Sequence, residues 1–136
     1  MVNTYGRDEL VWSELVDETE RFLVERARMA RSTSYTELNA ALEQRTGHPR
    51  FNFDLDAERA AIGSVRGKVA LRSLAVDGFM LSAIVIYLNA NDADEGFYRL
   101  AEQQGLIQSG APKELKDRFW SSQVSAAFEH YRRPAW

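Results

Sequence analysis

Residues 8–30 repeat apolar side chains at α-helical spacing, and this periodicity constrains the fold more than any other feature of the sequence. Acidic residues such as Glu14 and Glu18 fall mainly off the apolar stripe, so the segment has one apolar and one charged face. Such a segment predicts a long amphipathic helix whose apolar side is buried. The stripe consists of Val11, Leu15, Val16, Phe22, Leu23, Ala27 and Ala30.

A second helix is expected to start at Ser34. Ser34 and Glu37 have the spacing of a capping box, in which a hydroxyl and a carboxylate satisfy the first amide groups of a helix. Gly47 and Pro49 predict its end, because glycine favours the C-terminal cap and proline cannot continue a helix.

A third helix is predicted to open at Asp54 or Asp56 and to run to about Arg72. One of its faces is made only of small residues. Two glycines inside a helix cost about 1 kcal/mol each relative to alanine, so we expect something to approach this face closely. Another helix of the same domain is favoured over a nucleic-acid backbone or a partner chain. The apolar side is Ile62, Val65 and Val69, and the small face is Ala60, Gly63, Gly67 and Ala70.

The dipeptide Asp77-Gly78 lies between apolar residues 74–76 and 79–88, a pattern typical of a β-hairpin turn. The order helix, helix, helix, hairpin predicts a winged helix-turn-helix, so the expected fold class is mainly α with a small β-hairpin. We expect a single domain over residues 1–136, with the winged-helix core at 31–105 and flanking helices at 8–30 and 112–132. Two more helices are predicted, one containing Phe97, Leu100 and Ala101 and ended by Gly105, and a last one that begins at Pro112 and buries Leu115, Phe119, Val124, Ala127, Phe128 and Tyr131.

Composition excludes several classes of chemistry. The chain has no cysteine, so it forms no disulfide and no thiolate metal site and has no thiol nucleophile. The longest apolar run, residues 79–88, is too short to span a bilayer, so we expect no membrane partner and a cytoplasmic location. His48 and His130 are far apart in sequence and predict no metal site. With no catalytic set recognised, the chain is expected to be non-enzymatic and to need no cofactor.

Charge is distributed unevenly around the net value of −3. Residues 1–25 hold two basic and seven acidic groups (−5), residues 26–72 nine and five (+4), and residues 73–136 six and eight (−2). A basic middle segment can present a positive surface to phosphates, although solvated charges are an equally good interpretation. The basic candidates on the third helix are Arg59 and Arg66, which share nearly the same side, and Lys68 and Arg72, which lie on another.

Three motifs carry a resemblance to a known family. SYTELNAAL at 34–42, AAIG at 60–63 and RG at 66–67 resemble the DNA-binding domain of O6-alkylguanine-DNA alkyltransferases and alkyltransferase-like proteins. The resemblance covers about residues 31–105, and it implies that Tyr35 contacts a DNA phosphate and that the third helix lies against a DNA groove. The family's Pro-Cys-His-Arg strand has no counterpart, since residues 80–84 read MLSAI, so alkyl transfer is excluded. The patterns DGFMLSAIV and EGFYRLA are also similar to small bacterial and phage proteins without an assigned function.

Two functional hypotheses follow. The first is a winged-helix protein of phage or mobile-element origin that binds double-stranded DNA through Tyr35, Arg59, Arg66, Lys68 and Arg72, with the Asp77-Gly78 turn as its wing. The alternative is a protein-interaction module on the same scaffold, such as an inhibitor or adaptor of a nucleic-acid enzyme. The acidic first helix and the C-terminal residues Arg132, Arg133 and Trp136 motivate this alternative.

Overall fold

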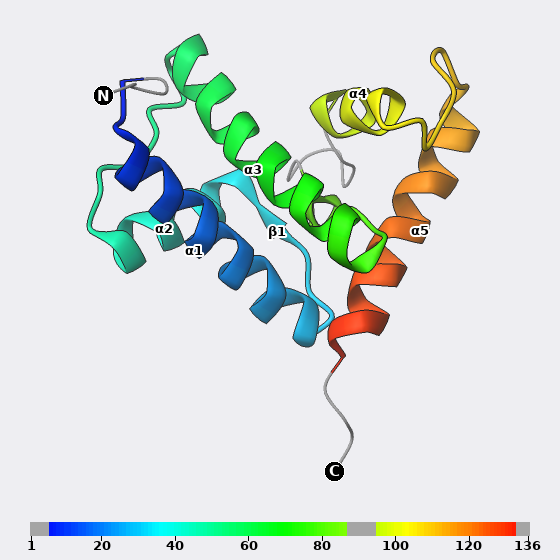
Figure 1. Cartoon of the computed structure of the whole chain (residues 1–136), viewed down its shortest axis with the longest axis horizontal. Coiled ribbons are helices and arrows are strands. Elements are labelled where there is room, and N and C mark those ends of the chain that lie inside the picture. The colour runs from blue at the N-terminus through cyan, green and yellow to red at the C-terminus, as the bar shows by residue number, and fades with distance from the viewer. Residues whose placement is uncertain (1–5, 87–94, 133–136) are drawn as a thin grey trace.

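The computed structural model describes residues 6–86 and 95–132, and this part of the chain is mainly helical with a two-stranded parallel sheet (Figure 1). The mainly α fold class is therefore confirmed. Helices α1 and α3 lie side by side and run in the same direction, and α5 lies beside their C-terminal ends (Figure 1). The elements in chain order are α1 (Glu9–Arg28), β1 (Thr33–Ser34), α2 (Tyr35–Thr46), α3 (Asp56–Asp77), the 3₁₀ helix η1 (Leu81–Ile84), β2 (Val85–Ile86), α4 (Glu95–Gln103) and α5 (Lys113–Tyr131).

Helices α1 and α2 begin where the sequence predicts; α2 ends at the predicted glycine, and α1 ends at Arg28, two residues before the predicted end. The Asp8 carboxylate accepts a hydrogen bond from the Val11 amide at 2.9 Å and caps α1. The Ser34 hydroxyl accepts from the Glu37 amide at 3.1 Å and caps α2. Gly47 ends α2 with φ at 76°, in the left-handed region that glycine enters without steric cost. These boundaries are set by local chemistry.

The predicted β-hairpin at Asp77-Gly78 is wrong. Helix α3 continues through residues 74–76 to Asp77, and Gly78 caps it with φ at 83°. The Gly78 amide donates to the carbonyl groups of Ser73 and Leu74 at 3.2 and 3.1 Å. A hairpin turn and a helix C-cap both require a residue with positive φ, so the same dipeptide suits either structure.

One short strand, β2, forms after Gly78, and it is hydrogen-bonded to an earlier part of the chain. Val85 and Ile86 of β2 run parallel to Thr33 and Ser34 of β1, in the register Thr33↔Val85 and Ser34↔Ile86. Residues 81–84, expected in a strand, form the 3₁₀ helix η1, and residues 87 and 88 lie outside the described ranges. Ser34 thus belongs to the sheet and also caps α2, which fixes where α2 begins.

Helix α1 is central to the main core. Its buried residues, among them Leu15, Leu23 and Ala27, pack in contacts with α2, α3, η1 and α5. A second, smaller cluster joins α3 and η1 to α4 around Phe97, which is 1% exposed. Burial of these apolar side chains is the main source of stability. The second cluster comprises Ala70, Met80, Ala83, Phe97, Tyr98 and Ala101.

The stripe predicted for the last helix does face the core, but most of it is only partly buried: Phe119, Val124, Phe128 and Tyr131 pack against the two clusters from the outside. Ala127 is the one fully buried residue of α5, and Leu115 is 47% exposed. Helix α5 is also held by polar contacts: the Trp120 indole N–H donates to the Ala83 carbonyl, and the Gln123 side-chain oxygen accepts from the Met80 amide, both at 2.8 Å. Helix α5 therefore satisfies backbone groups of the segment around η1.

The left-handed cap of α3 gives a stability prediction. Because an L-residue in the left-handed region costs about 1–2 kcal/mol, we expect Gly78→Ala to lower the free energy of unfolding by about 1 kcal/mol, as measured by urea denaturation. A Cβ at this position meets nothing within 4 Å, so the loss is conformational. Gly78→Asn should recover part of it, because asparagine tolerates this region better. An alanine variant as stable as the wild type would contradict the assigned cap.

Candidate interaction surface

The basic residues of α3 do not converge on one exposed face. Arg66 is 7% exposed and therefore buried, whereas Lys68 is exposed. Arg59 is exposed near the start of α3, where it contacts the Asp56 carboxylate and the Phe53 carbonyl. Three of the four predicted phosphate contacts, Arg59, Arg66 and Arg72, have partners within the chain.

Arg66 holds other elements against α3. Its Nη1 donates to the Tyr35 hydroxyl at 2.9 Å, so two residues expected on a DNA phosphate contact each other instead. Its guanidinium lies directly against the first turn of α4, where a Cβ added to Gly96 would sit 2.5 Å from Nη2. Gly96 is thus a glycine because Arg66 occupies the space of its side chain.

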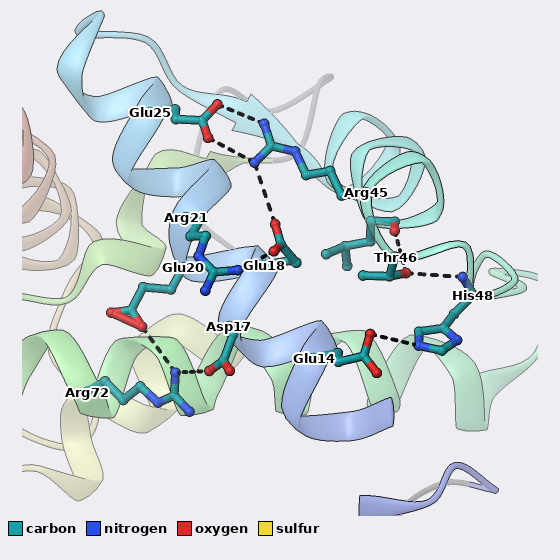
Figure 2. A network of polar contacts seen from close by, with 11 residues as sticks. Glu14, Asp17, Glu18, Glu20, Arg21, Glu25, Arg45, Thr46, His48 and Arg72 are labelled. Atoms are coloured by element: carbon teal, nitrogen blue, oxygen red, sulfur yellow. Dashed lines mark hydrogen bonds and ion pairs between the residues drawn. The ribbon is translucent and has the colours of Figure 1, made fainter. Parts of the chain in front are cut away.

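Arg72 is paired with α1. Its Nη1 donates to Asp17 at 2.8 Å and to Glu20 at 3.1 Å (Figure 2). The hydrogen bond to Asp17 is the main cause that raises the pKa of Arg72, with the Glu20 carboxylate adding to it and burial opposing it. Two carboxylates therefore compensate this positive charge, and it is poorly placed to attract a phosphate.

The acidic face of α1 is also engaged by α2. Arg45 donates to both carboxylate oxygens of Glu25, at 2.9 and 2.8 Å, and lies 3.9 Å from Glu18 (Figure 2). The hydrogen bond from Arg45 lowers the pKa of Glu25 below its ordinary value. His48 lies 3.3 Å from Glu14 on the same side. The first helix thus uses much of its acidic face for contacts within the chain.

Asp77 and Gly78, expected at the tip of a wing, join α3 to α5. The Tyr131 hydroxyl donates to Asp77 at 3.1 Å, and the His130 ring nitrogen Nε2 lies 3.3 Å from the same carboxylate. The Phe79 ring contacts both aromatic rings edge-on, with centroid distances of 5.4 Å to His130 and 6.1 Å to Tyr131. Burial and the bond to Asp77 raise the pKa of Tyr131 to about 12.

Two of the three C-terminal residues predicted to bind a partner lie outside the part of the chain that the structure describes. Arg132 is exposed, and its Nη1 lies 3.8 Å from the Glu129 carboxylate. Arg133 and Trp136 fall outside the described residues, and so do Asp92 and Asp94, one of which the sequence predicts as the N-terminal cap of the helix around Phe97.

The small face of α3 is largely open. A Cβ added to Gly63 or Gly67 would meet nothing within 4 Å beyond the local backbone of its own helix, and Ala60 is exposed. The expected close packing by another helix of the domain is thus absent among residues 6–86 and 95–132. Ala70 alone turns inward, into the second cluster. We call Ala60, Gly63 and Gly67 the glycine edge.

A groove of about 540 Å³ runs between α1 and α3 next to the glycine edge. Sequence reasoning identified Lys68 and Arg72 but missed the α1 side of the groove, because no local pattern gives the register between two helices. The groove and the glycine edge together form one surface, which we call the docking surface. The groove is lined by Glu9, Trp12, Ser13, Val16, Ser64, Lys68 and Arg72.

No metal or membrane chemistry is visible in the described part of the chain. It contains no group of three or more histidine, aspartate or glutamate residues placed to hold a metal ion. None of its helices is long and apolar enough to cross a bilayer.

Comparisons with protein-family models, with curated proteins and with solved structures found no match to this chain. The functional argument therefore depends on the geometry of the docking surface.

The open glycine edge gives a second stability prediction. Because alanine is about 1 kcal/mol better than glycine inside a helix and has space here, Gly63→Ala and Gly67→Ala should each raise the free energy of unfolding by roughly 0.5–1 kcal/mol in dilute solution. Gly96→Ala is the matched control in another helix and should destabilise the protein, because its Cβ would collide with Arg66. Destabilisation by both α3 variants would show that the edge is covered.

Tyr131 gives a prediction for the alkaline range. Its pKa rises from the ordinary value of 10.0 to about 12 in the folded protein, so the folded state keeps a proton that the unfolded state has lost. The stability contributed by Tyr131 is complete below pH 10 and is lost between pH 10 and about 12. In Tyr131→Phe, the unfolding midpoint should fall less steeply over this range. Parallel pH profiles for the two proteins would contradict the assignment.

Proposed function

We propose that this chain is a non-enzymatic protein-interaction module that binds another polypeptide along its docking surface. The observation that carries the proposal is the contrast between the open glycine edge and the internally paired arginines around it. The surface permits close approach but offers little free positive charge. A partner that fits these conditions presents a mostly uncharged backbone rather than a row of phosphates.

Helix geometry indicates the size of this partner. The stretch of α3 from Ala60 to Leu71 extends for about 16 Å, or three helical turns. Gly63 and Gly67, one turn apart, let a second backbone approach more closely than larger side chains would. Leu71, one turn after Gly67, is 38% exposed and adds apolar contact area. One helix of a partner can cover this stretch.

DNA binding stays a prediction, and the charges weigh against it. Duplex DNA carries one negative charge per about 1.7 Å, so affinity depends on several cations that are free to contact phosphates. Arg66 is buried, and Arg72 is held by two carboxylates. Lys68 remains as the exposed cation of this set that forms no ion pair with a described residue.

Photo-cross-linking tests the proposal. A photoreactive phenylalanine analogue is placed at Ser64 in the groove or, as a matched control, at the exposed Ser125 on α5. Illumination of cells that make the protein should give a discrete protein adduct from position 64 and none from position 125. Gly67→Arg in the same chain should abolish the adduct by blocking the glycine edge.

A DNA titration decides between the two functions. At low salt we expect the purified protein not to retard a duplex in gel electrophoresis. Retardation that weakens with salt and with Lys68→Ala, together with no adduct from position 64, would overturn the proposal in favour of DNA binding. Equal adducts from positions 64 and 125 would also contradict it, because the docking surface would then have no special role.

A further inference from the structure

We infer that the segment bound at the docking surface is an α-helix of another protein, which lies in the groove between α1 and α3 and carries one basic and one acidic residue on its bound face. This inference rests on the proposed function and names the chemistry of the partner. It follows from two charged residues that line the groove from opposite sides.

Glu9 on α1 and Lys68 on α3 line the same groove with opposite charges. Both are exposed, and neither forms an ion pair with a residue in the ranges that the structure describes. Arg72, the third charged residue of the lining, is already held by Asp17 and Glu20. The groove therefore presents an available carboxylate on its α1 side and an available ammonium group on its α3 side.

The two charges lie at different levels of the groove. Two ion pairs between the first half of α1 and α3 fix the register of these helices, which run in the same direction (Figure 1). This register places Glu9 level with residues 60–64 of α3. Lys68 lies one to two helical turns further along, about 6–12 Å away along the groove. The two ion pairs are Arg7–Glu58 and Asp17–Arg72, both at 2.8 Å.

An α-helix supplies two charges at this separation on one face. Residues four or seven positions apart in a helix are about 6 or 10 Å apart along its axis and lie on nearly the same side. A basic residue level with Glu9 and an acidic residue four or seven positions away, level with Lys68, therefore complement the groove. Trp12, which lines the groove one turn after Glu9 and is partly buried, offers apolar surface to a side chain between these two charges.

A helix fits the groove better than an extended segment does. An extended segment that binds in a protein groove satisfies its backbone amide and carbonyl groups best by pairing with the edge of a sheet. Both walls of the groove are helices, and neither strand of the described chain lines it. A helix brings its own backbone hydrogen bonds and contributes only side chains to the contact.

Identification of the cross-linked segment is the first test. The adduct formed by the photoreactive analogue at Ser64 is digested, and mass spectrometry identifies the partner peptide attached to it. We expect this segment to carry a basic and an acidic residue four or seven positions apart. A synthetic peptide of the segment should be helical by circular dichroism when it is bound to the full chain.

Charge reversal on the purified full chain is the second test. Lys68→Glu and Glu9→Lys should each raise the dissociation constant for the identified protein about ten-fold in calorimetric titration, because an attractive pair becomes a repulsive one. Replacing the acidic residue of the partner by lysine should restore binding to Lys68→Glu. Arg118→Glu and Glu114→Lys, reversals at exposed residues of α5, are matched controls and should leave the dissociation constant unchanged.

The outcomes separate this inference from the proposed function. The absence of an adduct from position 64 overturns both. A discrete adduct whose partner binds Lys68→Glu or Glu9→Lys as tightly as the wild type leaves the proposed function intact and overturns the inference, as does a bound segment that is not helical. Weakened binding in both variants, with rescue by the exchanged partner residue, supports both.

Discussion

The packing of α1 is the constraint on which the rest of the structure depends. Its apolar face is buried against four other elements, and the removal of Leu15 and Leu23 from water favours this arrangement. Arginines from α2 and α3, Arg45 and Arg72, contact its acidic sides. Each exposed ion pair contributes little stability alone, but together they fix the rotation of α1 and hence the groove that it shares with α3.

Sequence predicted those parts of the fold that depend on neighbouring residues. Ser34 and Gly47 act on amides or carbonyls within a few positions, so their spacing was sufficient to place α2, and the apolar periodicity of residues 8–30 was sufficient to place α1. The dipeptide Asp77-Gly78 shows the limit of such evidence, because a positive φ suits both a hairpin turn and a helix cap. The helix end is held by a contact that the dipeptide does not predict, since the Ser73 hydroxyl accepts from the Leu81 amide at 2.9 Å.

The candidate site was predictable only in part, since it depends on how helices meet. The glycine edge was visible in the sequence, but whether another element covers it was not. Arg66 illustrates the missing information. On a helical wheel it borders the apolar side next to Val65 and Val69, which favours burial, but its positive charge led to the prediction that it is exposed. Its partners Tyr35 and Gly96 are distant in sequence, and no pattern within α3 points to them.

The anchoring of η1 by α5 has a consequence for the order in which the chain can be built. The backbone groups of Met80 and Ala83 find their partners on Gln123 and Trp120, which are synthesised 43 and 37 residues later. A nascent chain that ends before α5 leaves these two groups without their native partners, and burying them unpaired would be costly. Helices α1 to α3 can assemble early, but the segment that joins them to α4 and α5 gains its final conformation only after α5 has been synthesised.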